Sequence, residues 1–438
     1  METREQKRKN RIKNAILLVL FIGLIVLTGV TWLSGLNLES IPEGTLLHRV
    51  YQRITYGVSG FELRTGSDAA AEPTRIAVST ADGLVGAQYQ TASVSMLYTV
   101  LREPMGAAID CAGAFAACTE EDFAQALAGE VLYFGYEGQL PLTLLSGWMG
   151  SGRSEELQKT DLLLLTGKGK LFIHGENGYQ WAETKGSPDA WAHLMQELSA
   201  GACSFAAQEG EKFSQVRPDT LLFEQESESA ERLTMRVPGF LEGQGGSDLT
   251  ALLEAFSYDP YVRTYQEDQG KTRVFVENYS TLHVSVDGEV SFHTSAMEGA
   301  LEAYSAAEVE KKDVLRLQTD FAYQLLRQVQ GSMSDTSKAM LFDVTEGESG
   351  VRVLSFLQTA GGIPVQVGET PFAWFEFREG RMIGAELHLR VFESAGEQSP
   401  LLPSRQAAAA APAEGLRPML AYTRAADGKF TAQRYYQK

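Results

Sequence analysis

Few residues in this chain combine the type and the spacing that catalysis or cofactor binding needs. Gly270-Lys271-Thr272 has the form of the end of a phosphate-binding loop. Such a loop also needs a glycine five positions before Gly270 and a helix directly after it. Position 265 is Tyr265, and the residues after Thr272 read as a strand. We therefore expect no nucleotide-binding loop here.

The motifs of common hydrolases and metalloenzymes do not occur either. The sequence contains no G-x-S-x-G, no H-E-x-x-H and no S-x-x-K. His283 and His388 fall on the polar faces of predicted strands, where solvated surface is the main interpretation and a metal ligand or general base the alternative. We predict a non-enzymatic protein with no catalytic residue, no cofactor and no metal site. The histidines are scattered, at His48, His174, His193, His283, His293 and His388.

Adjacent acidic residues are another candidate for chemistry. Glu120-Glu121 fits the first turn of a helix, and Glu267-Asp268 fits a turn. Glycoside hydrolysis needs two carboxylates that face each other across a cleft, a geometry that spacing along the chain does not show. We therefore interpret both pairs as structural.

The three cysteines, Cys111, Cys118 and Cys203, give little indication of function. There is no C-x-x-C pair, so redox catalysis and a zinc ribbon are not expected. Small buried residues are the main interpretation. In an exported domain Cys111 and Cys118 could instead be bridged, which would leave one thiol over.

Charge is distributed unevenly along the chain. Residues 1–14 carry six Lys and Arg against two Glu, a net charge of +4, so the other 424 residues sum to −22 for the total of −18. An acidic body offers no basic surface for phosphates, which argues against nucleic-acid binding. The overall composition, 44% hydrophobic and 21% charged, is that of a folded protein with a sizeable core.

The basic end leads directly into an apolar run at residues 15–33, 19 residues without a formal charge. As a helix this run spans about 29 Å, close to the thickness of a bilayer core. Basic residues ahead of it predict a cytoplasmic N-terminus and an extracytoplasmic body. The run is longer than the apolar region of a usual signal peptide, about 7 to 15 residues, and no A-x-A site follows it, so we expect a retained single-pass anchor, with cleavage as the alternative.

Downstream of the anchor, helical and strand patterns alternate. Thr119 and Asp122 predict a capped helix, the runs DLLLL and KLFIH predict a hairpin, and residues 272–295 predict an antiparallel meander. The clearest helix has a capping box at Ser305 and Glu308, an apolar stripe at Val314, Leu317, Phe321, Leu325 and Val329, and ends at Gly331.

The recurring order of a helix followed by paired strands predicts an α+β fold with antiparallel sheets, built as two or three α+β units after a transmembrane helix. The predicted organisation is a basic cytoplasmic tail (1–14), a transmembrane helix (15–33), a stalk (34–73), an N-terminal ectodomain region (74–215), a central α+β unit (216–300) and a C-terminal α+β unit (301–438).

Three segments resemble one family. Residues 120–149 (EEDFAQALAGEVLYFGYEGQLPLTLLSGWM) are similar to the first ectodomain region of YycH-type regulators. Residues 256–292 resemble the central unit shared by YycH and YycI, and VRVLSFLQTAGGIPV (351–365) resembles the third-unit strand that ends at Gly-Ile-Pro-Val. LLPSRQAAAA near residue 401 and LAYTR near 420 fit the C-terminal end of that family. The length and the extra N-terminal region favour the YycH branch.

The resemblance implies a regulator and not an enzyme. Proteins of this kind are anchored beside the sensor histidine kinase of the two-component system that controls cell-wall metabolism in Gram-positive bacteria. They act partly through transmembrane helix contacts, and a paralogous YycH or YycI protein is a further possible partner. Such contacts favour small and hydroxyl-bearing residues, and the candidates in the predicted helix are Gly23, Thr28, Gly29 and Thr31.

A different class of function stays open on the sequence alone. An anchored, extracytoplasmic module that binds cell-wall material, or a hydrolase with an unrecognised site, would have the same anchor and the same acidic body. The two hypotheses differ in what the protein binds: a two-helix histidine kinase in one case and peptidoglycan fragments in the other.

Overall fold

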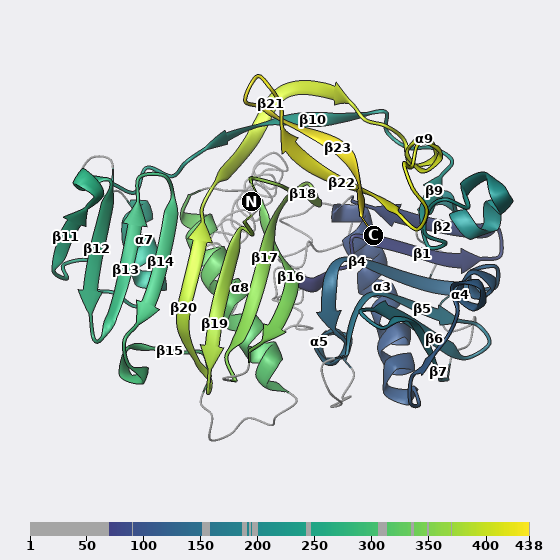
Figure 1. Ribbon diagram of the computed structural model, residues 1–438, viewed down its shortest axis with the longest axis horizontal. Coiled ribbons are helices and arrows are strands. Elements are labelled where there is room, and N and C mark those ends of the chain that lie inside the picture. The colour runs from purple at the N-terminus through teal and green to yellow at the C-terminus, as the bar shows by residue number, and fades with distance from the viewer. Residues whose placement is uncertain are drawn as a thin grey trace, which may run out of the picture. The chain divides into compact units, whose positions relative to one another are not determined.

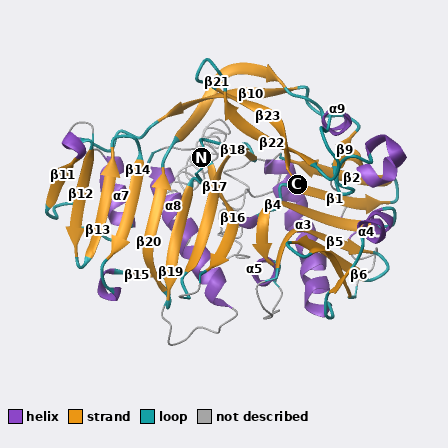
Figure 2. Ribbon diagram, viewed as in Figure 1, coloured by secondary structure: helices purple, strands orange, loops and turns teal. Residues whose placement is uncertain are grey.

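The computed structural model describes residues 70–437, apart from residue 90 and residues 151–157, 186–190, 192–193, 195–199, 242–246, 305–312, 334–336, 348–349 and 369. The chain divides into two compact units, Met1–Leu63 and Arg64–Lys438, and all described residues belong to the second. This unit is an α+β fold with two large sheets, as the sequence predicts (Figures 1 and 2). The predicted transmembrane helix lies outside the described residues.

The first sheet contains nine strands in the order β3-β7-β6-β5-β4-β1-β2-β8-β9, and neighbouring strands are antiparallel. The hairpin predicted from DLLLL and KLFIH is confirmed as β5 and β6. The strands are β1 (Arg75–Thr80), β2 (Gly83–Gln88), β3 (Ala116–Ala117), β4 (Val131–Pro141), β5 (Lys159–Thr166), β6 (Lys170–Gly175), β7 (Gly178–Glu183), β8 (Gly201–Phe205) and β9 (Leu221–Phe223).

Both faces of this sheet are covered, which explains the unbroken apolar runs in its strands. Leu163 and Leu165 of β5 belong to a core shared with helices α3 (Thr91–Cys111) and α5 (Leu142–Trp148). Leu162 and Leu164 point the other way, into a second core with α4 (Glu120–Leu127). Alternate residues of one apolar strand therefore serve two cores.

The start of α4 follows the predicted capping box. The Asp122 backbone N–H donates to the Thr119 hydroxyl at 3.1 Å, and the Thr119 N–H donates to the Asp122 carboxylate at 3.2 Å. Two N–H groups that the helix cannot satisfy internally are thereby paired.

The second sheet contains fourteen strands, with the main order β11-β12-β13-β14-β20-β19-β17-β18-β22-β23-β10-β21, while β15 pairs with β20 and β16 with β17. Only β18 and β22 pair in parallel among the strands described. The strands are β10 (Ser229–Arg236), β11 (Thr264–Glu267), β12 (Thr272–Glu277), β13 (Ser280–Ser285), β14 (Glu289–Thr294), β15 (Leu301–Glu302), β16 (Lys338–Glu346), β17 (Arg352–Ala360), β18 (Ile363–Val365), β19 (Ala373–Arg378), β20 (Arg381–His388), β21 (Val391–Pro400), β22 (Arg417–Arg424) and β23 (Phe430–Gln437).

Helices α7 (Ser247–Ala255) and α8 (Val314–Ser332) share a core with one face of the second sheet, and α8 runs behind strands β17–β20 in Figure 1. The meander predicted at 272–295 is confirmed as β12, β13 and β14. Strands that pair across residue 300, such as β14 and β20, lie in this one sheet. The domain boundary at that residue stays a prediction.

The buried stripe of α8 differs from the expected one in its first half. Leu325 and Val329 are buried as predicted, but Leu315 and Ala322 are buried more deeply than Val314 and Phe321. The helix packs against α7 on one side and contacts α5 of the first sheet on another, so its covered surface is wider than a single stripe. The predicted capping box at Ser305 and Glu308 lies outside the described residues.

The glycine pair before Pro364 forms a tight hairpin turn between β17 and β18. Gly361 and Gly362 have φ angles of +59° and +86°, which side chains rarely allow. The strand ends there, as the sequence predicts, and resumes for only three residues. Pro364 therefore sits in a short strand where one missing N–H costs little.

The two sheets approach each other closely where β4 passes β16. A Cβ atom at Gly138 would lie 1.8 Å from the Phe342 carbonyl oxygen, so only glycine fits without a backbone shift. Strand β4 bulges at this point, because its pairing with β5 is interrupted between Gly135 and Leu140. The strand continues past the bulge to Pro141.

We predict that Gly138→Ala destabilises the protein by about 3 kcal/mol, because the added methyl group must push apart two backbones. Gly147→Ala is the matched control. Its Cβ would meet nothing nearer than the Arg316 Cδ at 3.8 Å, and alanine favours helix α5 by about 0.5 to 1 kcal/mol. Urea unfolding midpoints measure both changes. Equal midpoints for the two variants would contradict the close approach.

Candidate functional site

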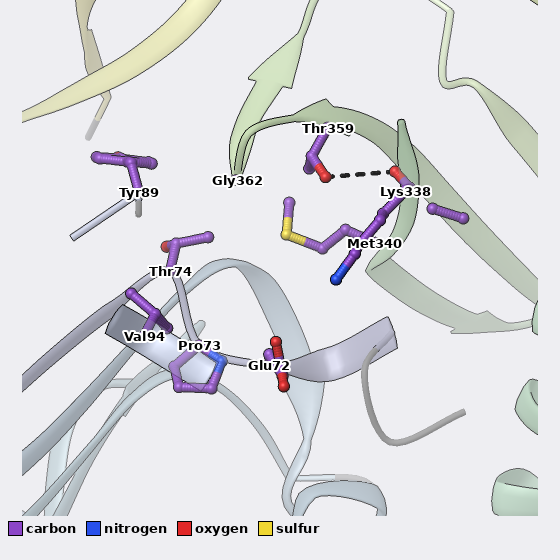
Figure 3. Close-up of a pocket in the computed structure, with 10 residues that line it drawn as sticks. Glu72, Pro73, Thr74, Tyr89, Val94, Lys338, Met340, Thr359 and Gly362 are labelled. Carbon is purple, nitrogen blue, oxygen red and sulfur yellow. Dashed lines mark hydrogen bonds between the residues drawn. The ribbon is translucent and has the colours of Figure 1, made fainter. Parts of the chain in front are cut away.

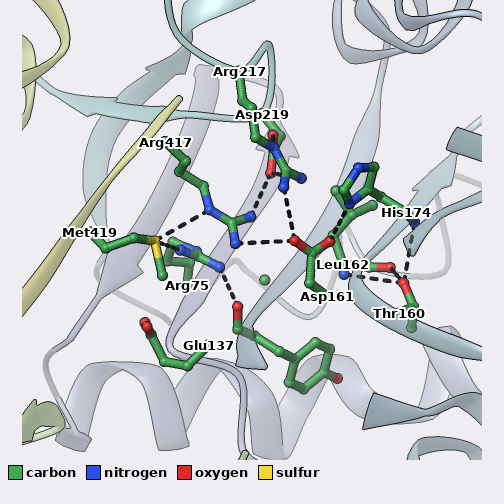
Figure 4. Close-up of polar contacts among 12 residues, drawn as sticks. Arg75, Glu137, Thr160, Asp161, Leu162, His174, Arg217, Asp219, Arg417 and Met419 are labelled. Atoms are coloured by element: carbon green, nitrogen blue, oxygen red, sulfur yellow. Dashed lines mark hydrogen bonds and ion pairs between the residues drawn. The ribbon is translucent and has the colours of Figure 1, made fainter. Parts of the chain in front are cut away.

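Five charged side chains form a buried cluster at the junction of the two sheets (Figure 4). We call this the buried ion cluster. None of its members is more than 5% exposed. The members are Arg75 of β1, Asp161 of β5, Arg217 and Asp219 from the segment before β9, and Arg417 of β22.

The two aspartates are held between two guanidinium groups. Arg217 contacts Asp161 at 2.8 Å and Asp219 at 3.0 Å, and Arg417 contacts each of the same carboxylates at 3.2 Å. The Tyr133 hydroxyl donates a further hydrogen bond to Asp219 at 2.9 Å. The carboxylates come from the first sheet region and Arg417 from the second sheet, so these contacts connect the two sheets.

Arg75 adds a third positive charge, which Glu137 balances. Its guanidinium donates to the Tyr136 carbonyl oxygen at 2.6 Å and contacts the Met419 sulfur at 2.9 Å. Glu137, only 4% exposed, lies nearby and accepts a hydrogen bond from Thr74 at 2.9 Å. The joint therefore holds three guanidinium groups and three carboxylates, so that its formal charges cancel.

Electrostatics keep the aspartates ionised. Burial alone would raise the pKa of Asp219, but Arg217 and Arg417 outweigh it and lower that pKa to about 2. The pKa of Asp161 is held well below its usual range against burial by the same two arginines, with a further hydrogen bond from His174. Burial raises the pKa of Tyr133, and the Asp219 carboxylate raises it further.

This arrangement is poorly suited to proton transfer. A general acid or base needs a pKa near the working pH, whereas both aspartate pKa values are lowered away from it. The Nδ1 atom of His174 lies 2.9 Å from the Asp161 carboxylate. The His174 side chain is 21% exposed, so it lies at the edge of the cluster. The cluster is best understood as a joint that fixes two sheets.

A small cavity of about 50 Å³ lies at the same junction (Figure 3). One wall comes from the first residues of the folded body, and the other from β16 and the β17–β18 turn. It is lined by Glu72, Pro73, Thr74, Tyr89, Val94, Lys338, Ala339, Met340, Thr359 and Gly362.

Two opposite charges line this cavity. Burial lowers the pKa of Lys338, and the Glu72 carboxylate acts in the opposite direction. Figure 3 shows both side chains extending toward the same space. Glu72 also accepts a hydrogen bond from the Ser95 hydroxyl at 2.7 Å, which fixes it to α3. A cavity of this size with two charged groups suits ordered water.

Tyr89 connects the cavity with the buried ion cluster. It has a φ angle of +54°, its N–H donates to the Thr74 carbonyl oxygen at 2.9 Å, and its hydroxyl accepts from the Leu420 N–H at 3.3 Å. That hydroxyl also contacts the sulfur of Met419, which both Arg75 and Arg417 touch. The strained backbone at Tyr89 is therefore held by contacts from both sheets.

Most site residues predicted from the sequence are not gathered here. Gly23, Thr28, Gly29 and Thr31 lie outside the described residues, as do His48 and His193. His283 and His388 lie on the polar face of the second sheet, as predicted, 3.6 Å from Glu267 and Glu386 respectively. No group of His, Cys, Asp and Glu suited to a metal occurs within the described ranges.

The cysteine expectation needs a partial correction. All three are free thiols. Cys203 is buried, and burial raises its pKa to about 12. Cys111 is exposed because it ends α3 on the solvent side, so the interpretation of the cysteines as small buried residues is wrong for it.

Comparisons with known proteins place this fold beside one solved structure. No family model matches the chain, and no curated protein matches it. The chain is similar in structure to YycH from Bacillus subtilis. The two share 11% sequence identity with a TM-score of 0.47 over 84% of this chain and 97% of that one. This is the family that the sequence resembles; at such a level the likeness assigns no role to any residue.

None of the helices in the described part of the chain is both long and apolar enough to cross a membrane. The described body also extends into the predicted stalk, since Ala70 and Ala71 are buried in the first core. The rest of the stalk, like the predicted span, lies outside the described residues.

We predict that Asp219→Asn destabilises the protein by about 3 to 5 kcal/mol at neutral pH, because it leaves Arg217 and Arg417 short of a buried counter-charge. The folded-state pKa of Asp219 is lowered, so its stabilisation is present above the unfolded pKa of 3.8 and is lost as the pH falls toward about 2. The difference in the free energy of unfolding between wild type and variant should therefore decrease by about 2 kcal/mol from pH 5 to pH 2.

The control is Asp427→Asn, which removes an exposed partner of Arg232. Exposed ion pairs contribute little, so no measurable change is expected. Urea unfolding followed at several pH values distinguishes the cases. If the difference in unfolding free energy between wild type and Asp219→Asn stays constant from pH 5 to pH 2, the lowered pKa of Asp219 is contradicted.

Proposed function

We propose that this protein is a membrane-anchored, non-enzymatic regulator of a sensor histidine kinase that controls cell-wall metabolism in a Gram-positive bacterium. In this proposal residues 15–33 form a single transmembrane helix, with the N-terminus in the cytoplasm and the folded body outside. The length of the chain favours the YycH branch of the family that its sequence resembles.

The observation that carries the proposal is the place where the chain enters the folded body. Ala70 and Ala71 are 0% and 1% exposed, and Glu72 and Thr74 follow directly as walls of the cavity between the sheets. Thr74 is hydrogen-bonded to Glu137 beside the buried ion cluster. The segment that comes from the predicted anchor is therefore fixed at the joint of the body.

Such an entry point suits a regulator. If the arrangement of the two sheets changed, residues 70–74 would move with it, because they are packed at the joint within the described body. Asp161 and Asp219 are each paired with Arg217 and Arg417, and the two aspartates are held in one ionisation state. These features favour a body that transmits contacts over one that performs chemistry.

Within the membrane, the proposed contact with the kinase uses the helix at 15–33. Small and hydroxyl-bearing side chains allow helices to approach closely in lipid, and Gly23, Thr28, Gly29 and Thr31 are the residues of this type. A paralogous protein of the YycH or YycI type could bind in the same way.

We predict that replacing residues 15–33 with an unrelated apolar helix abolishes regulation while the protein remains in the membrane. The physical reason is the loss of specific packing, which a generic apolar helix does not provide. The measurement is the output of the kinase, read as phosphorylation of its response regulator, with protein level checked in parallel. A replacement that keeps Gly23, Thr28, Gly29 and Thr31 is the matched control and should retain regulation. Kinase output identical to wild type with the full replacement would contradict this route.

We further predict that the tagged full-length protein, captured from solubilised membranes, brings a two-helix histidine kinase with it. The control is the chain with the unrelated helix at 15–33, which should lose the kinase. Recovery of peptidoglycan fragments, or hydrolysis of cell-wall material by the captured protein, would favour the alternative of a wall-binding module or hydrolase.

A further inference from the structure

The edge of the second sheet at β11 is exposed and carries no strand on its outer side among the described residues. It is the last strand in the sheet order, and Thr264, Tyr265, Gln266 and Glu267 are all exposed (Figure 1). Open edges are usually protected by shortness, charged side chains, proline or a bulge. Strand β11 is short and ends at Glu267, but it has no lysine, no proline and no bulge against β12, and it carries a tyrosine that is 48% exposed.

The direction of the free backbone groups on this edge follows from the ladder with β12. The Val276 N–H donates to the Arg263 carbonyl oxygen at 3.4 Å, which marks residues 263 and 276 as a hydrogen-bonded pair. Hydrogen-bonded and non-hydrogen-bonded pairs alternate in an antiparallel ladder. Residues 265 and 267 therefore also turn their backbone groups toward β12, while Thr264 and Gln266 turn theirs outward.

The segment Arg263-Thr264-Tyr265-Gln266-Glu267 is complementary to itself in one antiparallel register. If Tyr265 faces Tyr265 of a second copy, Thr264 faces Gln266, and each such pair exchanges both of its N–H···O bonds. The same register places Arg263 opposite Glu267 twice. Arginine, tyrosine and glutamate share one face of the sheet, next to Val276, Val274 and Thr272 of β12.

Other registers lose these matches. A slip by one residue sets an outward-facing residue against an inward-facing one and breaks the hydrogen bonds. A slip by two sets Tyr265 against Arg263 or Glu267 and leaves the other charge without its partner. Glu267 is 43% exposed beside His283, so it can reach a second chain.

We propose that β11 is a self-association edge, through which two copies of this chain join their second sheets about a two-fold axis at Tyr265. The pairing is isologous, so it closes as a dimer and leaves no further edge of this kind. A strand of four residues gives a small contact, and the association is favoured where both copies are held in one membrane. The proposal does not depend on the kinase.

The test is disulfide trapping of the full-length chain in membranes, with Cys111 and Cys118 replaced by serine. In the proposed register the Cα atoms of residue 265 lie about 4.5 Å apart, within disulfide reach. Tyr265→Cys should therefore form a cross-linked dimer under mild oxidation. Thr264→Cys is the control, because its symmetry mate would lie about 8 to 9 Å away, beyond that reach.

Charge exchange tests the register through a second pair of side chains, Arg263 and Glu267. In the Tyr265→Cys background, Arg263→Glu should lower the rate of cross-linking about tenfold, since it opposes two like charges. Adding Glu267→Arg restores complementarity and should restore the rate. Unchanged urea midpoints show that the variants fold.

Three results would overturn the proposal: no dimer from folded Tyr265→Cys, equal cross-linking from Thr264→Cys, or a disulfide to a different protein. The last would show that this edge takes a strand from another partner. None of these results bears on whether residues 15–33 contact a kinase.

Discussion

The two sheets of this protein depend on one set of buried charge contacts. Arg417 reaches from β22 to Asp161 and Asp219 in the first sheet region, and Arg217 closes the set. Each of these groups is almost fully withdrawn from water, so any one of them is tolerable only while the others are present. The directions of these hydrogen bonds restrict how the two sheets can meet, in addition to the apolar core that they share.

The local elements could be predicted from the sequence to a large extent, because their signals are local. The capped helix at Thr119, the β5–β6 hairpin and the meander from residue 272 each rest on neighbouring residues. The joining of distant strands could not be predicted. Strand β10 pairs with β21, about 160 residues later in the chain, and nothing in either segment specifies the other.

The candidate site could not be predicted for the same reason. Its charged residues come from four separate segments, and a single aspartate before four leucines, as at Asp161, is the sole local sign of a buried charge. Arg217 and Asp219 stand beside the position where the second region was expected to begin, yet β9 just after them pairs with β8 of the first sheet. The predicted anchor lies outside the described residues.

The position of Arg417 also bears on biosynthesis. It lies 256 residues after Asp161 and 198 residues after Asp219, so the two aspartates receive that counter-charge only after this long stretch of chain has been made. A nascent chain that has not yet reached β22 lacks this partner for its acidic groups, and its first sheet is less stable. A copy that stops before β22 would therefore be a better substrate for quality-control proteases.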